Sequence, residues 1–388
     1  MGFIASMETT RSAPAQAALA PNAWSELTVS AMTDPYLALR SPDWLAHRYD
    51  PGHDAVHFVR ADRAERRIAP FLIDEHLAGH GQPLVVGRQD AVAAHAGAAK
   101  LNLIFHSAYC CSTLLANAYD RAGRSYALKE PVILNDLVGW RHRGAAPEQL
   151  KIVLNDALAL LARPLETGEV GVIKPSNVVN GLAPAIMAAR PEARALLLYA
   201  PLELFLGSIA QKGLWGRLWV RDLMSKQLVD GLIQFGFTAK DHLLQTDLQV
   251  AAVGWLAQHA LFARLAQAWP DRVRTLDSET LLARAGDTLA AADRLFGIAS
   301  DAAERERVVA DVFARNAKSG EAFTAVDRRD NQVNAAAAYA DELEKTEVWA
   351  LAVAEKAGLP VKAPLPLLDL QKKGGLSAAL RNGAVTSA

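Results

Sequence analysis

The sequence predicts an α/β protein of three layers, with a mostly parallel central sheet between two layers of helices, plus helical additions. Between residues 100 and 300, short apolar runs alternate with stretches of helical period, a pattern typical of parallel strands covered on both faces. The 388 residues are 51% hydrophobic and 21% charged, so the chain can bury a large core. At 101–115, LNLIFHSAYCCSTLL passes from an apolar run through small polar residues into a helical pattern.

Five apolar runs are the expected strands of the central sheet. They lie at 101–106, 125–129, 169–174, 194–199 and 272–276. Helical periods are expected at 112–122, 132–140, 147–162, 177–189, 202–212, 216–235 and 248–268. In sheets of this class, ligands bind beyond the carboxyl ends of the strands. The residues that end each strand are therefore the first candidates for a site.

The flanking segments predict additions to this core rather than a second fold. Residues 1–99 are expected to form an N-terminal extension of short helices and a few strands packed on the core at 100–300. Residues 301–370 are read as a helical part of the same domain, with a polar break at 316–334 before an amphipathic helix at 335–357. We expect residues 371–388 to be a disordered tail, and the first 20 residues a disordered leader.

Bulk composition excludes several classes of function. A net charge of −1 provides no basic field for nucleic acid, and no apolar run reaches the roughly 18 residues that span a bilayer. The two cysteines are adjacent, so no disulfide framework is expected, which favours a cytoplasmic protein. Richness in Ala and Arg suggests a bacterial chain. The ten histidines form no metal-ligand motif, so no metal is expected, and a homodimer stays an open alternative.

The junction after the first core strand is a candidate anion site. A helix that begins at Ser112 directs unpaired N–H groups and the positive end of its dipole toward the preceding loop. The pattern G-x-x-x-x-G-K-[ST] is absent, because no Gly lies between 98 and 122 and no Lys between 101 and 128. Ordinary ATP or GTP hydrolysis is therefore not expected. A plain helix cap at Ser112 and Thr113 is the structural alternative.

Five blocks, taken together and in order, resemble the sulfotransferase family over residues 100–320. They are FHSAYCCSTLLANAYD, ALKEPVILNDL, VIKPSN, ALLLYAPLELFLGSIAQKG and LDSETLLARAGDTLAAADRLFGI. The resemblance implies a P-loop-like α/β fold and 3′-phosphoadenosine 5′-phosphosulfate (PAPS) as donor, without a metal. In that family the first loop wraps the 5′-phosphosulfate. The residues here that match this loop are Tyr109, Cys110, Cys111, Ser112 and Thr113, with Tyr109 where the family carries its basic residue.

The resemblance also implies two elements for the 3′-phosphate of the donor. The family places an Arg at the end of the fourth strand and a Ser on the next helix. Here the strand ends without Arg, Ser208 lies about one residue off the family spacing, and Lys212 or Arg217 could supply the charge. A third, basic element near the C-terminus corresponds to Lys318, Ser319 and Gly320.

Three residues at strand ends are candidates for the chemistry. Sulfuryl transfer needs positioning, charge stabilisation and a base for the acceptor hydroxyl. Glu130 is the favoured base, Lys174 could stabilise the bridging oxygen, and His106 could supply a proton or a cation. The structural alternatives are a loop-stabilising carboxylate, a lysine that closes a strand, and a strand-end histidine. A cysteine nucleophile is disfavoured, because no Arg lies six residues after either cysteine.

The sequence therefore favours transfer of a sulfuryl group from PAPS to a hydroxyl or amine of a small molecule or glycan. Two alternatives remain open. The chain could be a catalytically degenerate descendant that binds a nucleotide or a partner protein through the same cleft. It could also be another transferase or kinase that uses the loop for a different anionic donor.

Overall fold

A five-stranded parallel sheet forms the centre of the protein. The computed structural model describes residues 39–77, 81–94, 99–314 and 325–368, with the backbone alone over 325–337. The strands of the central sheet are β4 (Leu101–His106), β5 (Ser125–Lys129), β6 (Val170–Lys174), β7 (Ala195–Tyr199) and β8 (Val273–Asp277). Their spatial order is β5-β6-β4-β7-β8, and every neighbouring pair is parallel. The predicted α/β class is confirmed, and each strand lies within one residue of its expected range.

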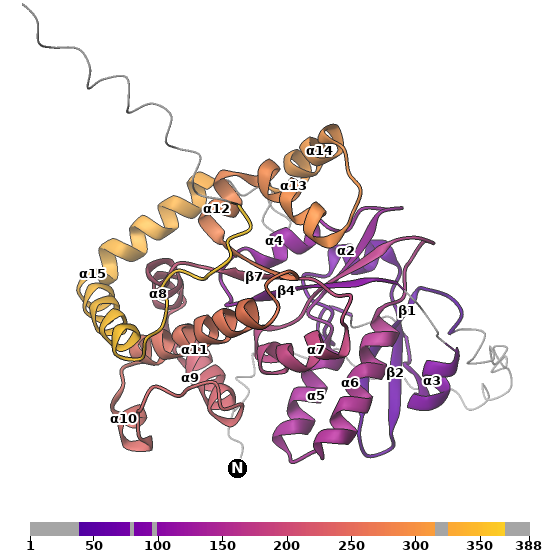
Figure 1. Ribbon diagram of the computed structural model, residues 1–388, viewed down its shortest axis with the longest axis horizontal. Helices are drawn as coiled ribbons and strands as arrows, with labels where there is room; N and C mark the ends of the chain where they lie inside the picture. The colour runs from indigo at the N-terminus through magenta and orange to yellow at the C-terminus, as the bar shows by residue number, and fades with distance from the viewer. Residues whose placement is uncertain (1–38, 78–80, 95–98, 315–324, 369–388) are drawn as a thin grey trace, which may run out of the picture.

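Helices cover both faces of this sheet, which gives the three predicted layers (Figure 1). Next to the sheet on one side lie α5 (Val132–His142), α6 (Pro147–Leu161), the 3-10 helix η1 (Asn177–Leu182) and α7 (Ala183–Ala189). The other layer contains α4 (Ser112–Asn117), α8 (Leu202–Gln211), α9 (Gly213–Val229), α12 (Ser278–Ala283) and α13 (Ala285–Phe296). Helix α11 (Asp247–Ala268) contributes side chains to the core on both sides.

Alternation along the central strand explains the two layers. Leu103 and Phe105 of β4 belong to the core beneath α5 and α6, whereas Ile104 belongs to the core beneath α4, α8 and α13. Successive side chains of a strand point to opposite faces, so a strand that is apolar throughout needs cover on both. All six residues of β4 are buried. Strand β4 is therefore an interior strand, and its carboxyl end lies in the middle of the sheet edge.

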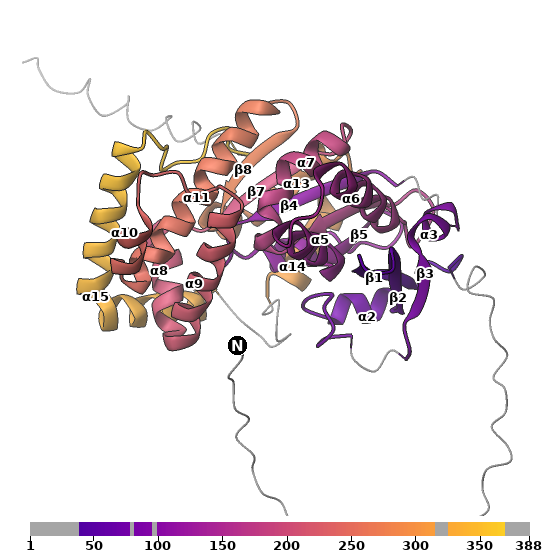
Figure 2. The ribbon, with the colours of Figure 1, turned by 90° about the horizontal axis from the view of Figure 1, so that it is seen from below.

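The N-terminal segment forms a second, smaller sheet. Strands β1 (Trp44–Asp50), β2 (Ala55–Arg60) and β3 (Leu84–Gly87) are antiparallel in the order β1-β2-β3, accompanied by α2 (Arg63–Ile68) and α3 (Arg88–Ala94). Strand β1 packs against α5 and α6 and shares their apolar core. This sheet lies at one end of the molecule, opposite α9, α10 (Ala239–Leu244) and α15 (Ala325–Lys356) (Figure 2).

Helices α4, α9 and α15 differ most from their expected ranges, and the helix expected at 177–189 is divided into η1 and α7. Helix α4 ends at Asn117 instead of 122, because Arg121 and Ser125 form a bridge around a turn with Gly123 at φ +73°. Helix α9 ends at Val229, since Gly231 takes a left-handed conformation. The expected break at 316–334 is wrong over 325–334, where α15 is already helical. Local polarity does not stop a helix that lacks Pro and Gly.

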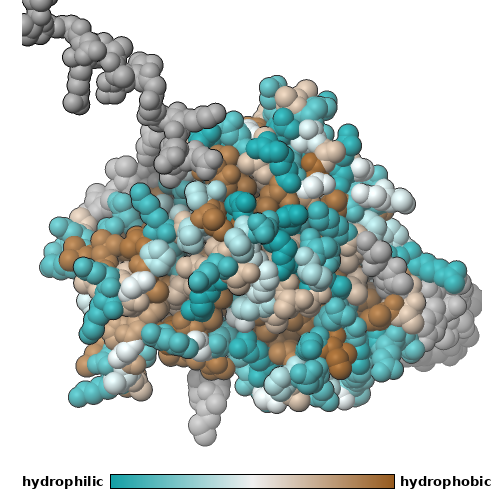
Figure 3. Space-filling model, in the orientation of Figure 1, coloured by the Kyte–Doolittle hydropathy of each residue, from teal (hydrophilic) through white to brown (hydrophobic). Residues whose placement is uncertain are grey.

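Helix α14 (Ala302–Val312) completes the described C-terminal region. Within the described residues, no helix combines the length and apolarity needed to cross a membrane. Large apolar side chains are exposed on α9, α10 and α15, including Trp215, Leu243 and Val348. Figure 3 shows apolar surface at the left, where Figure 1 places α15. The expected leader at 1–20 and tail at 371–388 lie outside the described residues.

Candidate functional site

The three candidate catalytic residues meet at the carboxyl edge of the sheet. His106 ends β4, Lys174 ends β6, and Glu130 directly follows β5. Because β5, β6 and β4 are adjacent and parallel, their carboxyl ends lie side by side. The Lys174 ammonium forms an ion pair with Glu130 Oε1, and His106 Nε2 lies 3.9 Å from the same oxygen. These three residues form one cluster, although 24 to 68 positions of the sequence separate any two of them.

The loop from β4 to α4 has an unusual backbone. Ala108, Tyr109 and Cys111 have φ angles of +71°, +51° and +62°, and Glu130 across the edge has +53°. Six described non-glycine residues have positive φ, and four of them lie in this site. Such conformations cost on the order of 1–3 kcal/mol each and cluster at ligand-binding loops. Successive left-handed residues also turn main-chain N–H groups toward a common side, which favours anion binding.

Several main-chain donors of this loop are available. Helix α4 begins at Ser112 as predicted, and its first internal acceptor is Cys111 O, bonded by Leu115 N at 3.1 Å. The N–H groups of Tyr109, Cys110, Thr113 and Leu114 have no acceptor among the residues that the structure describes. Ser112 and Thr113 are only 6% and 5% exposed. The loop therefore offers several N–H donors at the start of a short helix, together with two mostly buried hydroxyls, of which that of Ser112 bonds the Cys110 thiol.

His106 holds the loop to the neighbouring strand end. Its Nδ1 accepts the Ala108 N–H at 3.1 Å, and its Nε2 lies 3.0 Å from Pro175 O. The ring therefore accepts at Nδ1 and donates from Nε2, which defines a neutral tautomer. With both nitrogens occupied, His106 cannot supply a proton or a cation to a donor without first releasing one of these bonds.

Tyr109 does not replace the basic residue expected at its position. Its ring packs edge-on against Trp219 at a centroid distance of 5.4 Å and near Phe205 at 6.1 Å. Burial raises the pKa of Tyr109, so the phenol stays neutral. Tyr109 can thus offer an anion its main-chain N–H and a neutral phenol O–H, but no positive charge.

The cysteines serve the loop by size rather than by reactivity. Cys110 is fully buried, and burial raises the pKa of its thiol to about 11. Its Sγ lies 3.5 Å from Leu198 O. A thiol in this state is neither a nucleophile nor a redox sensor at neutral pH. Cys111 is partly exposed and occupies the left-handed position before α4.

The Glu130–Lys174 pair is built into the sheet edge. Glu130 N donates to Lys174 O at 2.6 Å, so main chain and side chains both join the two strand ends. Lys174 is 1% exposed and its Nζ lies 4.9 Å from the centre of the Phe71 ring, whereas the Glu130 side chain is 19% exposed. The carboxylate is the more accessible partner.

Lys129 lies on the other side of its strand. Its Nζ donates to Arg67 O at 2.8 Å, and burial lowers the pKa of the ammonium to about 8. Neighbouring positions on a strand face opposite ways, so the succession Lys129-Glu130 separates the two charges.

The residues expected at the 3′-phosphate are not assembled in the same way. Ser208 on α8 donates its hydroxyl to Leu204 O at 2.8 Å, one turn earlier in the helix. Lys212 ends α8 and is exposed. Arg217 on α9 pairs with Glu342 at 3.0 Å and lies 3.7 Å from Asp247. Lys318, Ser319 and Gly320 lie outside the described residues.

Sequence reasoning missed a buried amide network behind the loop. Asn180 Nδ2 donates to His106 O and to Gln258 Oε1, both at 2.9 Å, and Gln258 is completely buried. Trp255 Nε1 donates to Ala200 O at 2.8 Å from the same helix α11. No local motif announces these residues, because 74 and 78 positions separate Asn180 from its two partners. This network holds the carboxyl end of β4 in place through the bond to His106 O.

Within the described part of the chain, no group of three or more His, Cys, Asp or Glu side chains is arranged to hold a metal ion.

Comparison with known proteins gives only remote likenesses. No family model and no curated protein matches the chain. It is similar to sulfotransferase STF9 from Mycobacterium avium, at 12% identity over 66% of this chain and 81% of that one, with a TM-score of 0.37. A sulfotransferase domain from the curacin biosynthetic pathway has 12% identity over 70% of this chain and 100% of that one, with a TM-score of 0.36.

A third solved structure, sulfotransferase STF1 from Mycobacterium tuberculosis H37Rv, has 14% identity over 63% of this chain and 79% of that one, with a TM-score of 0.34. All three are sulfotransferases, the family that the sequence blocks at 100–320 resemble. With identities and TM-scores this low, they assign neither donor, acceptor nor reaction to this chain. A function has to be argued from its own residues.

Proposed function

We propose that this protein transfers a sulfuryl group from PAPS to a hydroxyl or amine of a small molecule or glycan. The proposal rests on two structural features that lie close together at the carboxyl edge of the sheet. A loop with unpaired main-chain donors lies at the end of β4. Lys174 ends the neighbouring strand β6, and Glu130 follows β5, the next strand beyond β6. One element suits an anionic donor, and the other suits an acceptor that must lose a proton.

In the proposed reaction the loop residues from Tyr109 to Thr113 hold the 5′-phosphosulfate. Donors aimed at charge that develops on the bridging oxygen favour its departure. Glu130 takes the proton from the acceptor as the acceptor oxygen or nitrogen forms its bond to sulfur. The bond from sulfur to the bridging oxygen breaks, and adenosine 3′,5′-bisphosphate leaves with that oxygen. The Glu130 oxygen not bonded to Lys174 is the one available for the proton.

His106 is assigned a positioning part in this proposal. Its two hydrogen bonds hold Ala108 of the anion loop and Pro175 beside Lys174 in a fixed relation. Lys174 supplies positive charge next to the reacting groups, although its ammonium is buried against Glu130 and Phe71. No resident metal enters the proposal.

One observation favours a second candidate, a protein that binds a nucleotide without catalysis. The loop contributes no cationic side chain, because Tyr109 is neutral and packed against aromatic rings. Loss of that cation removes a group that would stabilise the departing oxygen.

Calorimetry followed by a transfer assay tests both candidates. Adenosine 3′,5′-bisphosphate and ATP are titrated separately into the protein, and release of the bisphosphate from PAPS is then measured with a panel of hydroxylated acceptors. Micromolar binding of the bisphosphate with acceptor-dependent release supports transfer. Binding without release supports the second candidate. Binding of ATP alone contradicts the proposal in both forms and favours a different anionic donor.

A further inference from the structure

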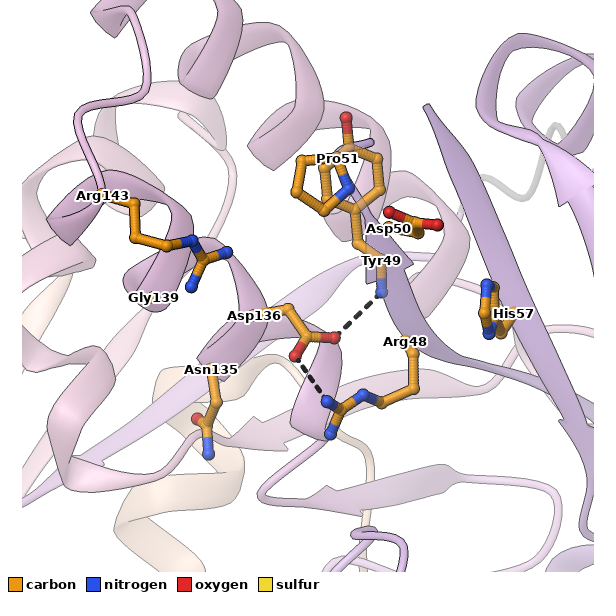
Figure 4. A pocket seen from close by; sticks show the side chains of 9 residues that line it. All are labelled: Arg48, Tyr49, Asp50, Pro51, His57, Asn135, Asp136, Gly139 and Arg143. Carbon is orange, nitrogen blue, oxygen red and sulfur yellow. Dashed lines mark hydrogen bonds and ion pairs between the residues drawn. The ribbon is translucent and has the colours of Figure 1, made fainter. Parts of the chain in front are cut away.

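A cleft of about 410 Å³ lies between the small N-terminal sheet and helix α5 (Figure 4). It is lined by the end of β1, by His57 of β2, by Asn135, Asp136 and Gly139 on one face of α5, and by Arg143 directly after that helix. Its volume is within the range of small-molecule sites, which run from about 300 to 1,000 Å³. Several polar groups line it, and they differ in whether they already have a hydrogen-bond or ion-pair partner within the protein.

On the β1 side the polar groups satisfy one another. Arg48 lies 3.2 Å from Asp136 and 3.2 Å from Asp74, and Tyr49 N donates to Asp136 at 2.9 Å. Figure 4 shows the two bonds to Asp136 as dashed lines. Burial raises the pKa of Asp136, while Arg48 and the Tyr49 N–H oppose that shift. Asp136 is thus held mainly from this side of the cleft, and the more distant Arg143 adds a weaker favourable charge.

On the α5 side two groups have no protein partner. The Arg143 guanidinium makes no hydrogen bond or ion pair with any described residue. The Oδ1 atom of Asn135 is buried and has no hydrogen-bond donor. Arg143 brings several N–H donors and a positive charge, and Asn135 brings one acceptor. Together these two groups complement a molecule that has both an anionic group and a hydroxyl group.

The helix positions both groups on one line. Residues 135, 139 and 143 follow at intervals of four. Arg143 directly follows α5 and its N–H still bonds Gly139 O at 3.1 Å, so the three residues lie along one face. Long side chains of a helix point back toward its N-terminus, which directs Arg143 over Gly139 toward Asn135. A Cβ at Gly139 would lie 3.1 Å from Arg143 Nη1. The absence of a side chain at 139 therefore gives the guanidinium its place along the helix.

The cleft borders the edge where Glu130 lies. Helix α5 begins at Val132, two residues after Glu130. Leu72 bonds through its main chain to Lys129 O at 2.7 Å and to Val132 N at 3.2 Å, on both sides of Glu130. Two residues further, Asp74 bonds Arg48 of the cleft. A molecule in the cleft would thus lie along α5, with Asn135 about one turn and Arg143 about three turns from the helix end next to Glu130.

We propose that this cleft binds a small hydroxylated molecule that carries an anionic group, of about the size of a sugar acid or a sugar phosphate. The anionic group lies on Arg143, whose planar fork suits carboxylate and phosphate alike. A hydroxyl donates to Asn135 Oδ1 after the amide group rotates and exposes that buried atom to the cleft. That the bound molecule is the acceptor of the reaction rests on the proposed function; that the cleft binds it does not.

The test uses calorimetry on the full chain without any donor. Glucuronate, glucose 6-phosphate and glucose are the probes, so that carboxylate, phosphate and no anion are compared on one sugar frame. We expect one or both charged probes to bind, and glucose to bind at least about 10-fold more weakly, because a charge-assisted bond is missing. The stronger of the two charged probes identifies the anion.

Arg143→Gln should weaken the charged probe about 10- to 100-fold, and Arg294→Gln, an exposed arginine on α13, is the matched control. Gly139→Ala supplies a second variant that keeps every charge, since its Cβ crowds Arg143 Nη1 and alanine favours the helix. It should weaken the same probe several-fold. Equal affinity for glucose and the charged probes, or no effect of Arg143→Gln, overturns the proposal, as does the absence of binding by all three.

A transfer assay with the bound probe as acceptor then separates the two proposals. Binding that depends on Arg143, without sulfuryl transfer to the probe, leaves the cleft site standing and counts against the proposed function. Transfer that is insensitive to Arg143→Gln counts against the cleft and leaves the proposed function intact.

Discussion

Two regions carry the residues expected to hold the two ends of a PAPS donor, and they are built differently. At the end of β4, a strained loop leaves main-chain donors unpaired beside an ion pair and a histidine with fixed bonds. At the corner of α8 and α9, the Ser208 hydroxyl bonds its own helix, and Arg217 is held by Glu342. The first region keeps donors free at a cost in backbone strain, whereas the second uses its donors internally.

The difference teaches where recognition of the donor is concentrated. A group already bonded within the protein must break that bond before it binds a ligand, so its net contribution is small. The main-chain N–H groups of Tyr109, Cys110, Thr113 and Leu114 need no such exchange, whereas Ser112 first has to release the Cys110 thiol. We therefore expect the 5′ end of the donor to contribute most of the affinity, and the 3′-phosphate to contribute little through Ser208.

The largest expected effect concerns Glu130. Glu130→Gln keeps an acceptor for Lys174 but removes the base, so turnover should fall about 100- to 10,000-fold, while affinity for adenosine 3′,5′-bisphosphate stays nearly unchanged. Initial rates and calorimetry measure the two quantities. Unchanged turnover in a folded variant would place the base elsewhere.

The next effect concerns the stability of the β5–β6 edge. Lys174→Met leaves Glu130 without its cation in a mostly buried setting and should lower the free energy of unfolding by about 3 kcal/mol. Urea unfolding measures the loss. The double variant Lys174→Met/Glu130→Gln is the control, because it removes the unpaired charge and should recover part of the stability. A double variant no more stable than Lys174→Met would argue against a stabilising ion pair.

A contrast between the two regions gives the third prediction. Ser112→Ala/Thr113→Ala should weaken bisphosphate binding by about 1–3 kcal/mol, since two hydroxyl donors at the loop are lost. Ser208→Ala should change it by less than about 0.5 kcal/mol, because that hydroxyl bonds Leu204 O. Calorimetry measures the bisphosphate affinity of both variants. A larger loss from Ser208→Ala would reverse the ranking of the two regions.

The smallest effect depends on pH. Burial lowers the pKa of Lys129 to about 8, below its unfolded value of about 10.4. The unfolded chain then binds more protons between these values, so this lysine makes stability rise as pH increases through that window. Lys129→Met should flatten the rise between pH 8 and pH 9.5, measured by urea unfolding, while exposed Lys212→Met is the control. An unchanged slope would mean that the ammonium stays charged in its buried position.

The sequence predicts the strand ends better than the contacts around them. Apolar runs that end in His106, Glu130 and Lys174 imply one common edge, because parallel strands share their direction. The order that makes β5, β6 and β4 neighbours depends on the packing of the whole sheet. The internal bond of Ser208 and the support of the loop by Asn180 and Gln258 depend on side-chain rotamers and distant segments. The polar residues 325–334 are likewise helical, because helical propensity prevails there over polarity, and the helix is kinked only further on, at Tyr339 (φ −125°, ψ 19°).

The central claim is that main-chain N–H groups after β4 bind the anionic end of the donor, and the two cysteines allow a direct test. Protein labelled with ¹⁵N-cysteine gives only two amide signals, both from this loop, and Cys110→Ala assigns them. Addition of adenosine 3′,5′-bisphosphate should move the Cys110 amide proton downfield, as expected for a new bond to an anion. Binding seen by calorimetry with both cysteine amides unmoved would contradict the account.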